Sequence, residues 1–495
     1  MEKTDSDERN NVFLKLASTK DNSVYIADDF FLVSAIEHTH KILLSDYIGQ
    51  IARLPDINLK IEYSALKNDT LNGQPVSVIS QIEKIYPDYP DSEQYFNYSE
   101  LNPGQPAADY YHRYIDVPVV YGDPSQGTFQ LYYELCSDYD ENKPTILIPT
   151  DGQRTLSQVD WADRYKEIFD LDYNTVTYEY RGMYCSDIPA INDRNLDWRT
   201  AYEILKSDHV VEDIERIRQD LMGDKSIYLL GGSGTAMIGL KYLEKYHQHV
   251  ERAFLMSFFK DAVTSSTAGV RYFHNFLTRN KLYPQYRSAV ANHAVDEAQL
   301  LFLIQRLLYY DEDEVVQLLN ELSQNRLERY RQYSEQFGSL DYFVRSAWKY
   351  KPWSVVFMYE TNISTSMDSM PDINYPFLKM AEPVTRAFGS EATAGHQFNI
   401  ENLENITTEI LLVGGTLDQV VPIEELEAIH ARLPNSKLAV FEAYHCLEAP
   451  EQSRTYRNEL ANLFFRYGHS APELLETFGR LIKKPTPYPQ NPIEP

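Results

Sequence analysis

Cysteine, positive charge and long apolar runs are all scarce in this chain of 495 residues. Its three cysteines, Cys136, Cys185 and Cys446, have no paired spacing, which argues against a disulfide framework and for a reducing compartment. Lysine and arginine number 46 against 73 acidic residues, and the resulting net charge of −27 repels nucleic acid and anionic membranes. No apolar run approaches the roughly 20 residues that span a bilayer, and the acidic start lacks the features of a signal peptide. We therefore expect a cytoplasmic protein whose partners include neither nucleic acid nor membrane.

Motifs that bind metals or organic cofactors are also missing from the sequence. It has no histidine-rich helix, no Cys-x-x-Cys pair and no glycine loop of the kind that cradles phosphate. We therefore expect no metal and no cofactor. Apolar residues, in contrast, make up 43% of the chain, which is ample for two or three packed structural units.

Short apolar runs predict eight strands, at residues 114–121, 129–135, 145–148, 174–180, 227–230, 253–258, 410–413 and 438–441. Helix-like spacers separate most of these runs, and this alternation predicts a mainly parallel sheet covered on both faces. The first two runs flank a turn signal, residues 123–127 (DPSQG), which predicts an antiparallel hairpin at one edge. Between the sixth and seventh strands the alternation stops, and helical periodicity predicts an inserted helical lid.

The chain accordingly divides into five expected segments. Residues 1–105 form an N-terminal extension of unknown role, with a loop-like stretch at 86–90 (YPDYP). The α/β core comprises residues 106–262 and 401–483, on either side of a lid at 263–400. A proline-rich tail, residues 484–495, is expected to be disordered.

The most informative stretch is GGSGT, which carries Ser233 between an expected strand and an expected helix. A strand, a sharp turn with a serine and a helix make up a nucleophile elbow, whose strained turn needs small neighbours. Ser233 is therefore the candidate nucleophile, and the N–H of Gly234 is a candidate oxyanion donor. The loop after the third strand, PTDGQR, supplies a second candidate donor in the N–H of Gly152.

Two further residues complete a candidate catalytic triad. A serine hydroxyl needs an adjacent base, and the base needs an orienting carboxylate. Asp418 follows the seventh expected strand and His445 follows the eighth. The order serine, acid, histidine, at the carboxyl ends of strands, is that of an α/β-hydrolase site.

Several blocks between about residues 112 and 450 resemble the prolyl aminopeptidases (proline iminopeptidases), a branch of the α/β-hydrolases. The blocks are 114–118 (YIDVP), 180–186 (YRGMYCS), 211–218 (VEDIERIR), 231–246 (the elbow and its helix), 272–286 in the lid and 359–360 (YE). They are similar to the family's VPLDY, QRGTGRS, VRDAEAIR, GQSYGGFLALTYL, YRRTYRRVAERNRAYY and HE.

The resemblance implies an α/β-hydrolase fold with Ser233, Asp418 and His445 as nucleophile, acid and base. The family removes an N-terminal proline and holds the free α-amine with glutamates of the lid. By position these glutamates are Glu360 and, in a looser match to the family's TGE block, Glu391. The resemblance therefore implies an aminopeptidase that acts on short peptides.

Two departures from the family leave other activities open. The family's oxyanion loop reads GGPG where this chain has DGQR at residues 151–154, and the third glycine of the elbow is Thr235. One alternative is an esterase or thioesterase that acts on a small metabolite. Another is a binding protein that kept the fold and lost turnover.

Overall fold

The computed structural model describes fourteen stretches of the chain: residues 11–15, 58–71, 74–88, 108–149, 161–169, 171–186, 188–191, 196–291, 294–309, 311–362, 372–389, 396–418, 420–447 and 451–471. The chain forms two compact units. The first comprises Met1–Tyr95 with Glu328–Ser339, and the second comprises Phe96–Leu327 with Leu340–Pro495. Gly152, Glu391 and the proline-rich tail lie outside the described residues.

The first unit contains an antiparallel sheet in the order β1-β2-β3, formed by Asn11–Lys15, Asn58–Leu71 and Gln74–Asp88. Helix α13 (Glu328–Phe337) belongs to the same unit. The expectation of a loop at 86–90 was wrong for its first three residues, which lie in β3. Among the described strands β3 is an edge of the sheet, and edge strands are where proline is tolerated.

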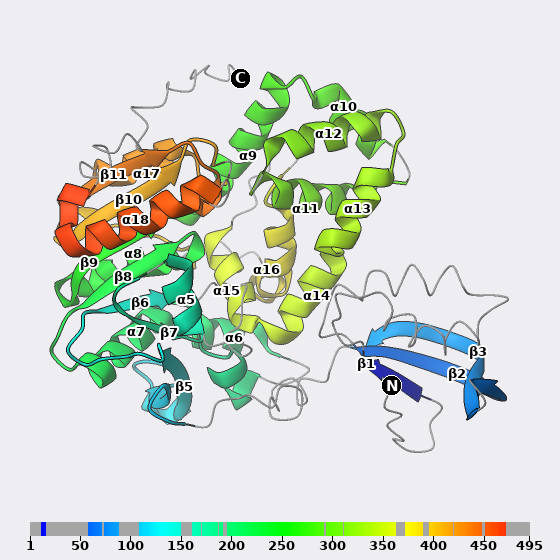
Figure 1. The fold of residues 1–495 in the computed structure, drawn as a ribbon, viewed down its shortest axis with the longest axis horizontal. Coiled ribbons are helices and arrows are strands. Elements are labelled where there is room, and N and C mark those ends of the chain that lie inside the picture. Colours follow the sequence, from blue (N-terminus) through cyan, green and yellow to red (C-terminus); the bar gives the residue numbers. More distant parts are fainter. Residues whose placement is uncertain are drawn as a thin grey trace. The chain divides into compact units, whose positions relative to one another are not determined.

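The second unit is built on an eight-stranded sheet in the order β11-β10-β9-β8-β6-β7-β5-β4 (Figure 1). Its strands are β4 (His112–Pro118), β5 (Thr128–Leu135), β6 (Thr145–Pro149), β7 (Asn174–Tyr178), β8 (Ile227–Gly232), β9 (Val250–Met256), β10 (Glu409–Gly415) and β11 (Ser436–Phe441). Among the described strands of this sheet, only β5 pairs antiparallel to its neighbours, and all other pairs are parallel. The predicted eight-stranded, mostly parallel sheet with a leading hairpin is confirmed.

Helices cover both faces of this sheet. On one face, α5 (Trp161–Phe169) and α18 (Glu451–Tyr467) pack in a buried apolar cluster that includes Leu230 and Phe254. Leu229 and Leu255, which alternate with these two residues along β8 and β9, point to the opposite face. There they contact α8 (Gly234–Tyr246) at Gly239, where an added Cβ would lie 3.1 Å from Leu229 and 3.3 Å from Leu255. A small residue is therefore needed where α8 crosses the strands.

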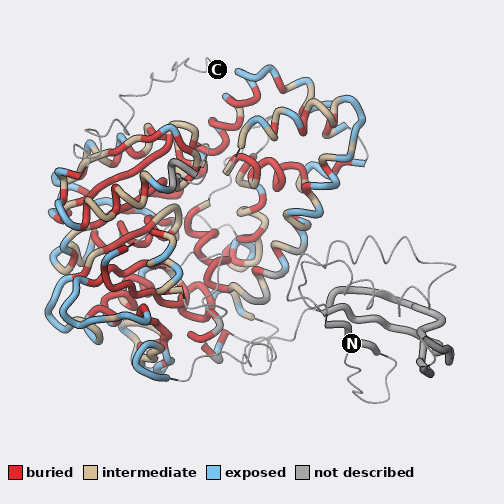
Figure 2. Tube along the Cα trace, in the orientation of Figure 1, coloured by how far each residue is buried: buried red, intermediate tan, exposed pale blue. Residues whose placement is uncertain are grey.

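Between β9 and β10 the described residues of this unit form seven further helices: α9 (Ala262–Arg279), α10 (Tyr283–Val290), α11 (Glu297–Leu308), α12 (Glu312–Ser323), α14 (Leu340–Tyr350), α15 (Pro352–Thr361) and α16 (Tyr375–Phe388). They confirm the predicted helical lid between the sixth and seventh strands. Every residue of α15 is buried, and Figure 2 shows this helix in red along its length. Within the described ranges, every helix is too short or too polar to cross a bilayer.

Aspartates begin several of these helices. Asp261, Asp296 and Asp311 accept hydrogen bonds from backbone N–H groups in the first turns of α9, α11 and α12. Asp197 does the same for α6 (Trp198–Leu205). A side-chain acceptor at this position satisfies a donor that the helix itself leaves unpaired. Part of the chain's acidic excess therefore defines where helices start.

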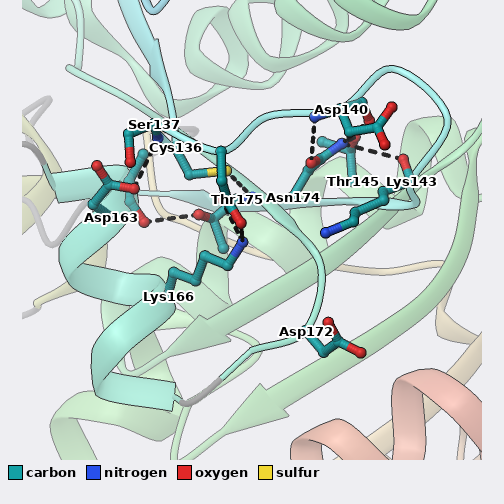
Figure 3. A network of polar contacts seen from close by, with 12 residues as sticks. Cys136, Ser137, Asp140, Lys143, Thr145, Asp163, Lys166, Asp172, Asn174 and Thr175 are labelled. Atoms are coloured by element: carbon teal, nitrogen blue, oxygen red, sulfur yellow. Dashed lines mark hydrogen bonds and ion pairs between the residues drawn. The ribbon is translucent and has the colours of Figure 1, made fainter.

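The amino ends of β6 and β7 are joined through a single buried amide (Figure 3). Asn174 donates from Nδ2 to the backbone oxygens of Asp140 and Lys143, at 2.6 and 3.2 Å. Its Oδ1 accepts from the backbone N–H of Asp140 at 3.0 Å. Both ends of the amide are thus satisfied, which fixes the loop before β6 at the edge of the sheet opposite the carboxyl ends of the parallel strands.

Candidate active site

Ser233 lies in the sharp turn between β8 and α8, with φ 56° and ψ −130°. A positive φ is costly for any residue with a side chain, so the surrounding structure must enforce it. An added Cβ at Gly231 would lie 3.0 Å from the backbone of Ala236, and one at Gly234 would lie 3.0 Å from the ring of Phe357. The turn therefore has the strained geometry and the crowded neighbours of a nucleophile elbow.

Thr235, the departure from a glycine in the elbow, has a structural role of its own. Its hydroxyl accepts a hydrogen bond from the backbone N–H of Gly232 at 2.9 Å and donates to the backbone oxygen of the same residue at 2.8 Å. The side chain thereby closes the turn from within. A threonine at this position is compatible with the elbow because it supplies the two hydrogen bonds that a glycine lacks.

Asp418 and His445 are brought together from the loops that follow β10 and β11. The Nδ1 atom of His445 lies 3.0 and 3.1 Å from the two carboxylate oxygens of Asp418. Asp418 also accepts from the backbone N–H groups of Val420 and Val421, both at 2.9 Å. These bonds orient the carboxylate, and the carboxylate in turn orients the imidazole so that Nε2 is the free nitrogen.

The electrostatics of His445 follow from its burial beside a negative charge. Burial opposes a charge on the imidazole, but the negative charge and the hydrogen bond of Asp418 prevail and raise the pKa of His445 well above its ordinary value. Nε2 is buried and has no hydrogen-bond partner among the described residues. The ring of Tyr309, at the end of α11, packs edge-on against the imidazole with centroids 4.9 Å apart.

Ser257 links the histidine loop to the strand beside the elbow, and sequence reasoning missed it. Its hydroxyl accepts a hydrogen bond from the backbone N–H of Cys446 at 3.1 Å. Ser257 and Cys446 both have positive φ, 48° and 51°. Ser233 donates from its backbone N–H to Met256, the residue before Ser257, at 2.9 Å. Ser233, Ser257 and Cys446, all with positive φ, are thus connected by these hydrogen bonds. The sequence carries no signal that would have identified Ser257.

Ser233 and Gly234 line a cavity of about 90 Å³. The other described residues of its wall are largely aromatic or apolar, with several neutral polar side chains: Met237, Ser257, Phe258, Phe259, Ser265, Tyr309, Trp353, Ser354, Phe357, Met358, Thr361, Asn362, Asn374, Phe377, Val420 and Val421. In this described wall there is no charged side chain. His445 and Asp418 are not part of the wall, but Tyr309 and Val420, which contact them, are.

Glu360 lies on α15, between residues that line the cavity, but its carboxylate is engaged elsewhere. Both oxygens accept from the backbone N–H of Ser207, the first residue of α7 (Ser207–Met222), at 3.1 and 3.2 Å. The side chain is 4% exposed, and burial raises its pKa to about 7, although the charge of Lys241 opposes the shift. Glu360 thus joins the lid to the core. Its role as an amine ligand stays a prediction, as does that of Glu391.

Arg181, in the block after β7, forms a buried ion pair rather than a wall of the cavity. Its guanidinium binds both carboxylate oxygens of Asp213 on α7, each at 2.7 Å. It also donates to the backbone oxygens of Val119 and Ile204, at 2.9 and 2.7 Å. Arg181 is fully buried, so that it connects a strand end, a helix and a loop inside the core.

Comparison with solved structures gave the following similarities. The structure is similar to a serine hydrolase from the polyaromatic-hydrocarbon-degrading bacterium Cycloclasticus zankles, with 14% identity, a TM-score of 0.38 and coverage of 72% of this chain and 98% of that one. It is similar to a meta-cleavage product hydrolase from Pseudomonas fluorescens, with 14% identity, a TM-score of 0.37 and coverage of 68% and 94%. A hydrolase from Pseudomonas aeruginosa gives 13% identity, a TM-score of 0.38 and coverage of 73% and 100%.

In sequence, no curated protein matches this chain. A family model does: the alpha/beta hydrolase fold matches residues 160–447, more than half of the chain. This range contains the elbow, the lid and the loops of Asp418 and His445. Together with the eight-stranded sheet and the lid inserted after its sixth strand, the match leads to one conclusion: the chain belongs to the α/β-hydrolase family.

Proposed function

We propose that this α/β-hydrolase is a serine hydrolase that cleaves esters of small, uncharged substrates. The observation that carries the proposal is the cavity, in which Ser233 and the N–H-bearing Gly234 face a wall of aromatic and neutral polar side chains. A volume of about 90 Å³ has room for roughly six to nine water-sized groups, since one such group needs about 10–15 Å³. Such a site suits a short acyl group or a single ring.

The proposed mechanism proceeds through an acyl-enzyme. Ser233 attacks the ester carbonyl while Nε2 of His445 takes the hydroxyl proton, and Asp418 stabilises the imidazolium that forms. The backbone N–H of Gly234, with that of Gly152 as the second proposed donor, holds the negative charge on the carbonyl oxygen. His445 then protonates the leaving alcohol. Water finally attacks the acyl-enzyme, with His445 as its base.

A second candidate is the aminopeptidase that the family resemblance implies. Glu360 favours it, because the carboxylate is buried on the same helix as Phe357 and Thr361, which line the cavity. An ammonium in a partly dry site requires such a carboxylate partner. The absence of charge from the described wall and the hydrogen bonds from Ser207 favour the esterase instead.

A substrate panel separates these candidates. We expect 4-nitrophenyl acetate and benzoate to be cleaved, proline and alanine 4-nitroanilides to be cleaved far more slowly, and all activity to be lost in Ser233→Ala. Hydrolysis of the anilides alone, abolished by Glu360→Gln, would establish the aminopeptidase.

A fluorophosphonate probe tests the nucleophile without reference to the substrate. The esterase and the aminopeptidase both require that the wild type is labelled and that Ser233→Ala is not. A folded wild type that stays unlabelled and cleaves nothing in the panel would point to a binding protein, and the proposal would be abandoned.

A further inference from the structure

Two asparagines, Asn362 at the end of α15 and Asn374 before α16, line the same cavity as Ser233. Both side chains are half-buried. In each, the amide nitrogen is held by the protein, and no donor within the described ranges reaches the amide oxygen. Two of the residues that line the cavity therefore each carry an uncharged amide oxygen that accepts no hydrogen bond from the described residues.

The amide of Asn374 is fixed by α9. Its Nδ2 donates to the backbone oxygen of Ser266 at 3.2 Å, which sets the orientation of the amide. An added Cβ at Gly269, one turn along, would lie 2.9 Å from Nδ2 and 3.0 Å from Oδ1. A glycine weakens the interior of a helix, and here it makes room for the amide against the helix backbone. Asn374 is thus positioned by two features of α9 at once.

The amide of Asn362 is fixed by its own helix. Its Nδ2 donates to the backbone oxygen of Met358 and to the hydroxyl of Thr361, both at 3.1 Å. The nitrogen therefore faces α15, and the oxygen faces away from these two partners. Because both amides use their nitrogens internally, neither can turn to offer a donor to a ligand without losing a bond.

From this arrangement we infer that Asn362 and Asn374 form a specificity subsite for a neutral hydrogen-bond donor, a hydroxyl or carboxamide N–H, on the substrate. The inference rests on the proposed serine hydrolase and specifies its substrate class. A substrate with such a donor pairs with the amide oxygens, whereas an apolar analogue of the same shape leaves them buried and unpaired. Sites built on such pairing reject the analogue far more strongly than apolar pockets do. The aromatic wall contacts the remainder of the ring or chain.

Matched esters test this subsite. The 4-nitrophenyl esters of 3- and 4-hydroxybenzoate are compared with those of 3- and 4-methylbenzoate, after correction for their uncatalysed hydrolysis. We expect kcat/KM to favour a hydroxyl ester about tenfold or more over its methyl partner, mainly through KM, since one hydrogen bond contributes on the order of a factor of ten. In Asn362→Leu and Asn374→Leu this ratio should fall towards one.

Gly269→Ala tests the subsite indirectly. Gly269 does not line the cavity, but the added methyl group would displace the amide of Asn374. The ratio should fall in Gly269→Ala but not in Thr267→Ala, an exposed substitution on the same helix. If Asn374→Leu or Gly269→Ala fails to fold, Asn362→Leu alone decides the question. An unchanged ratio in every folded asparagine variant would overturn the subsite.

Binding to a variant that cannot turn over substrate tests the subsite independently of the proposed esterase activity. Ser233→Ala is titrated calorimetrically with 3- and 4-hydroxybenzamide and with the two methylbenzamides. Tighter binding of a hydroxyl ligand supports the subsite even if no ester is cleaved. Equal binding of all four ligands overturns it even if the wild type proves to be an efficient esterase.

Discussion

Asp213 and Asp418 are both buried in the α/β core and both bind a basic side chain, but only one of the two partners can lose its proton. Asp213 is paired with Arg181, whose guanidinium stays charged at any pH that a protein survives. Asp418 is paired with His445, whose imidazole can both gain and lose a proton. The first pair suits a permanent link within the core, and the second suits proton transfer.

The two pairs also differ in how far the hydrogen-bonding groups of the basic side chain are used within the protein. Arg181 also binds the backbone oxygens of Val119 and Ile204, so its donors are largely used within the core. His445 keeps one buried nitrogen without a partner in the described part of the chain. The residue that follows it, Cys446, lies against Gly232 of the elbow. Satisfied polar groups stabilise a core, whereas an unsatisfied one marks a site where another molecule is expected.

The largest expected effect is on activity, in Asp418→Asn. The amide keeps the shape of the side chain but favours the wrong tautomer of His445, and such a change lowers kcat by about 10⁴ in a serine triad. Unfolding by heat should change little. Ester hydrolysis and the melting temperature are measured on the same preparation, and activity within tenfold of the wild type would exclude the triad.

Breaking the other pair should affect stability instead. Arg181→Met leaves Asp213 buried without a partner, which costs about 3–5 kcal/mol of unfolding free energy. The matched control is Arg345→Met, because its pair with Asp341 is largely exposed and contributes little. Both are measured by urea unfolding. Arg181→Met combined with Asp213→Leu should recover part of the loss, and equal destabilisation by Arg181→Met and its control would contradict the comparison.

Glu360 provides a third buried carboxylate, one without a cationic partner in direct contact among the described residues. Its pKa is about 7 in the folded protein and about 4.3 when exposed, so the native state binds the proton more tightly. Its contribution to stability is full below about pH 4 and is lost as the pH rises through about 7, by on the order of 3 kcal/mol. Glu360→Gln should therefore be more stable than the wild type at pH 8 and similar at pH 4.5. If the unfolding free energies of the wild type and of Glu360→Gln changed with pH in parallel, the raised pKa of Glu360 would be contradicted.

The smallest expected effect is a shift in the pH dependence of kcat/KM, caused by the charge of Asp418 acting on His445. Because His445 must be neutral to accept the proton of Ser233, kcat/KM should rise with pH through a pKa above its ordinary value of about 6.5. Below this pKa the rate should fall tenfold for each unit. In Asp418→Asn the midpoint of the residual activity should move down, since the negative charge is gone. A wild-type midpoint below 6 would be inconsistent with the charge of Asp418 acting on the imidazole.

Period and turn signals were sufficient to predict the second unit in outline. All eight strands lie within a few residues of their predicted positions. The first strand ends three residues early, because the chain leaves the sheet at Pro118 instead of continuing to residue 121. The strands of the N-terminal extension were not predicted, although Asn72-Gly73 between two stretches of alternating residues is a strong hairpin signal. The prolines at 87 and 90 favour a loop in the sequence, but an edge strand tolerates proline, and Pro87 lies in β3.

The sequence alone determined the strand order along the chain, the elbow around Ser233 and the loops that carry Asp418 and His445, because these depend on local pattern and on a fixed sheet topology. Only the tertiary structure decided what surrounds them. The engagement of Glu360 by α7 and the amide of Asn374 held against α9 both arise where segments distant in sequence come into contact. Such contacts depend on how the lid helices pack, and no periodicity within a single segment encodes that packing.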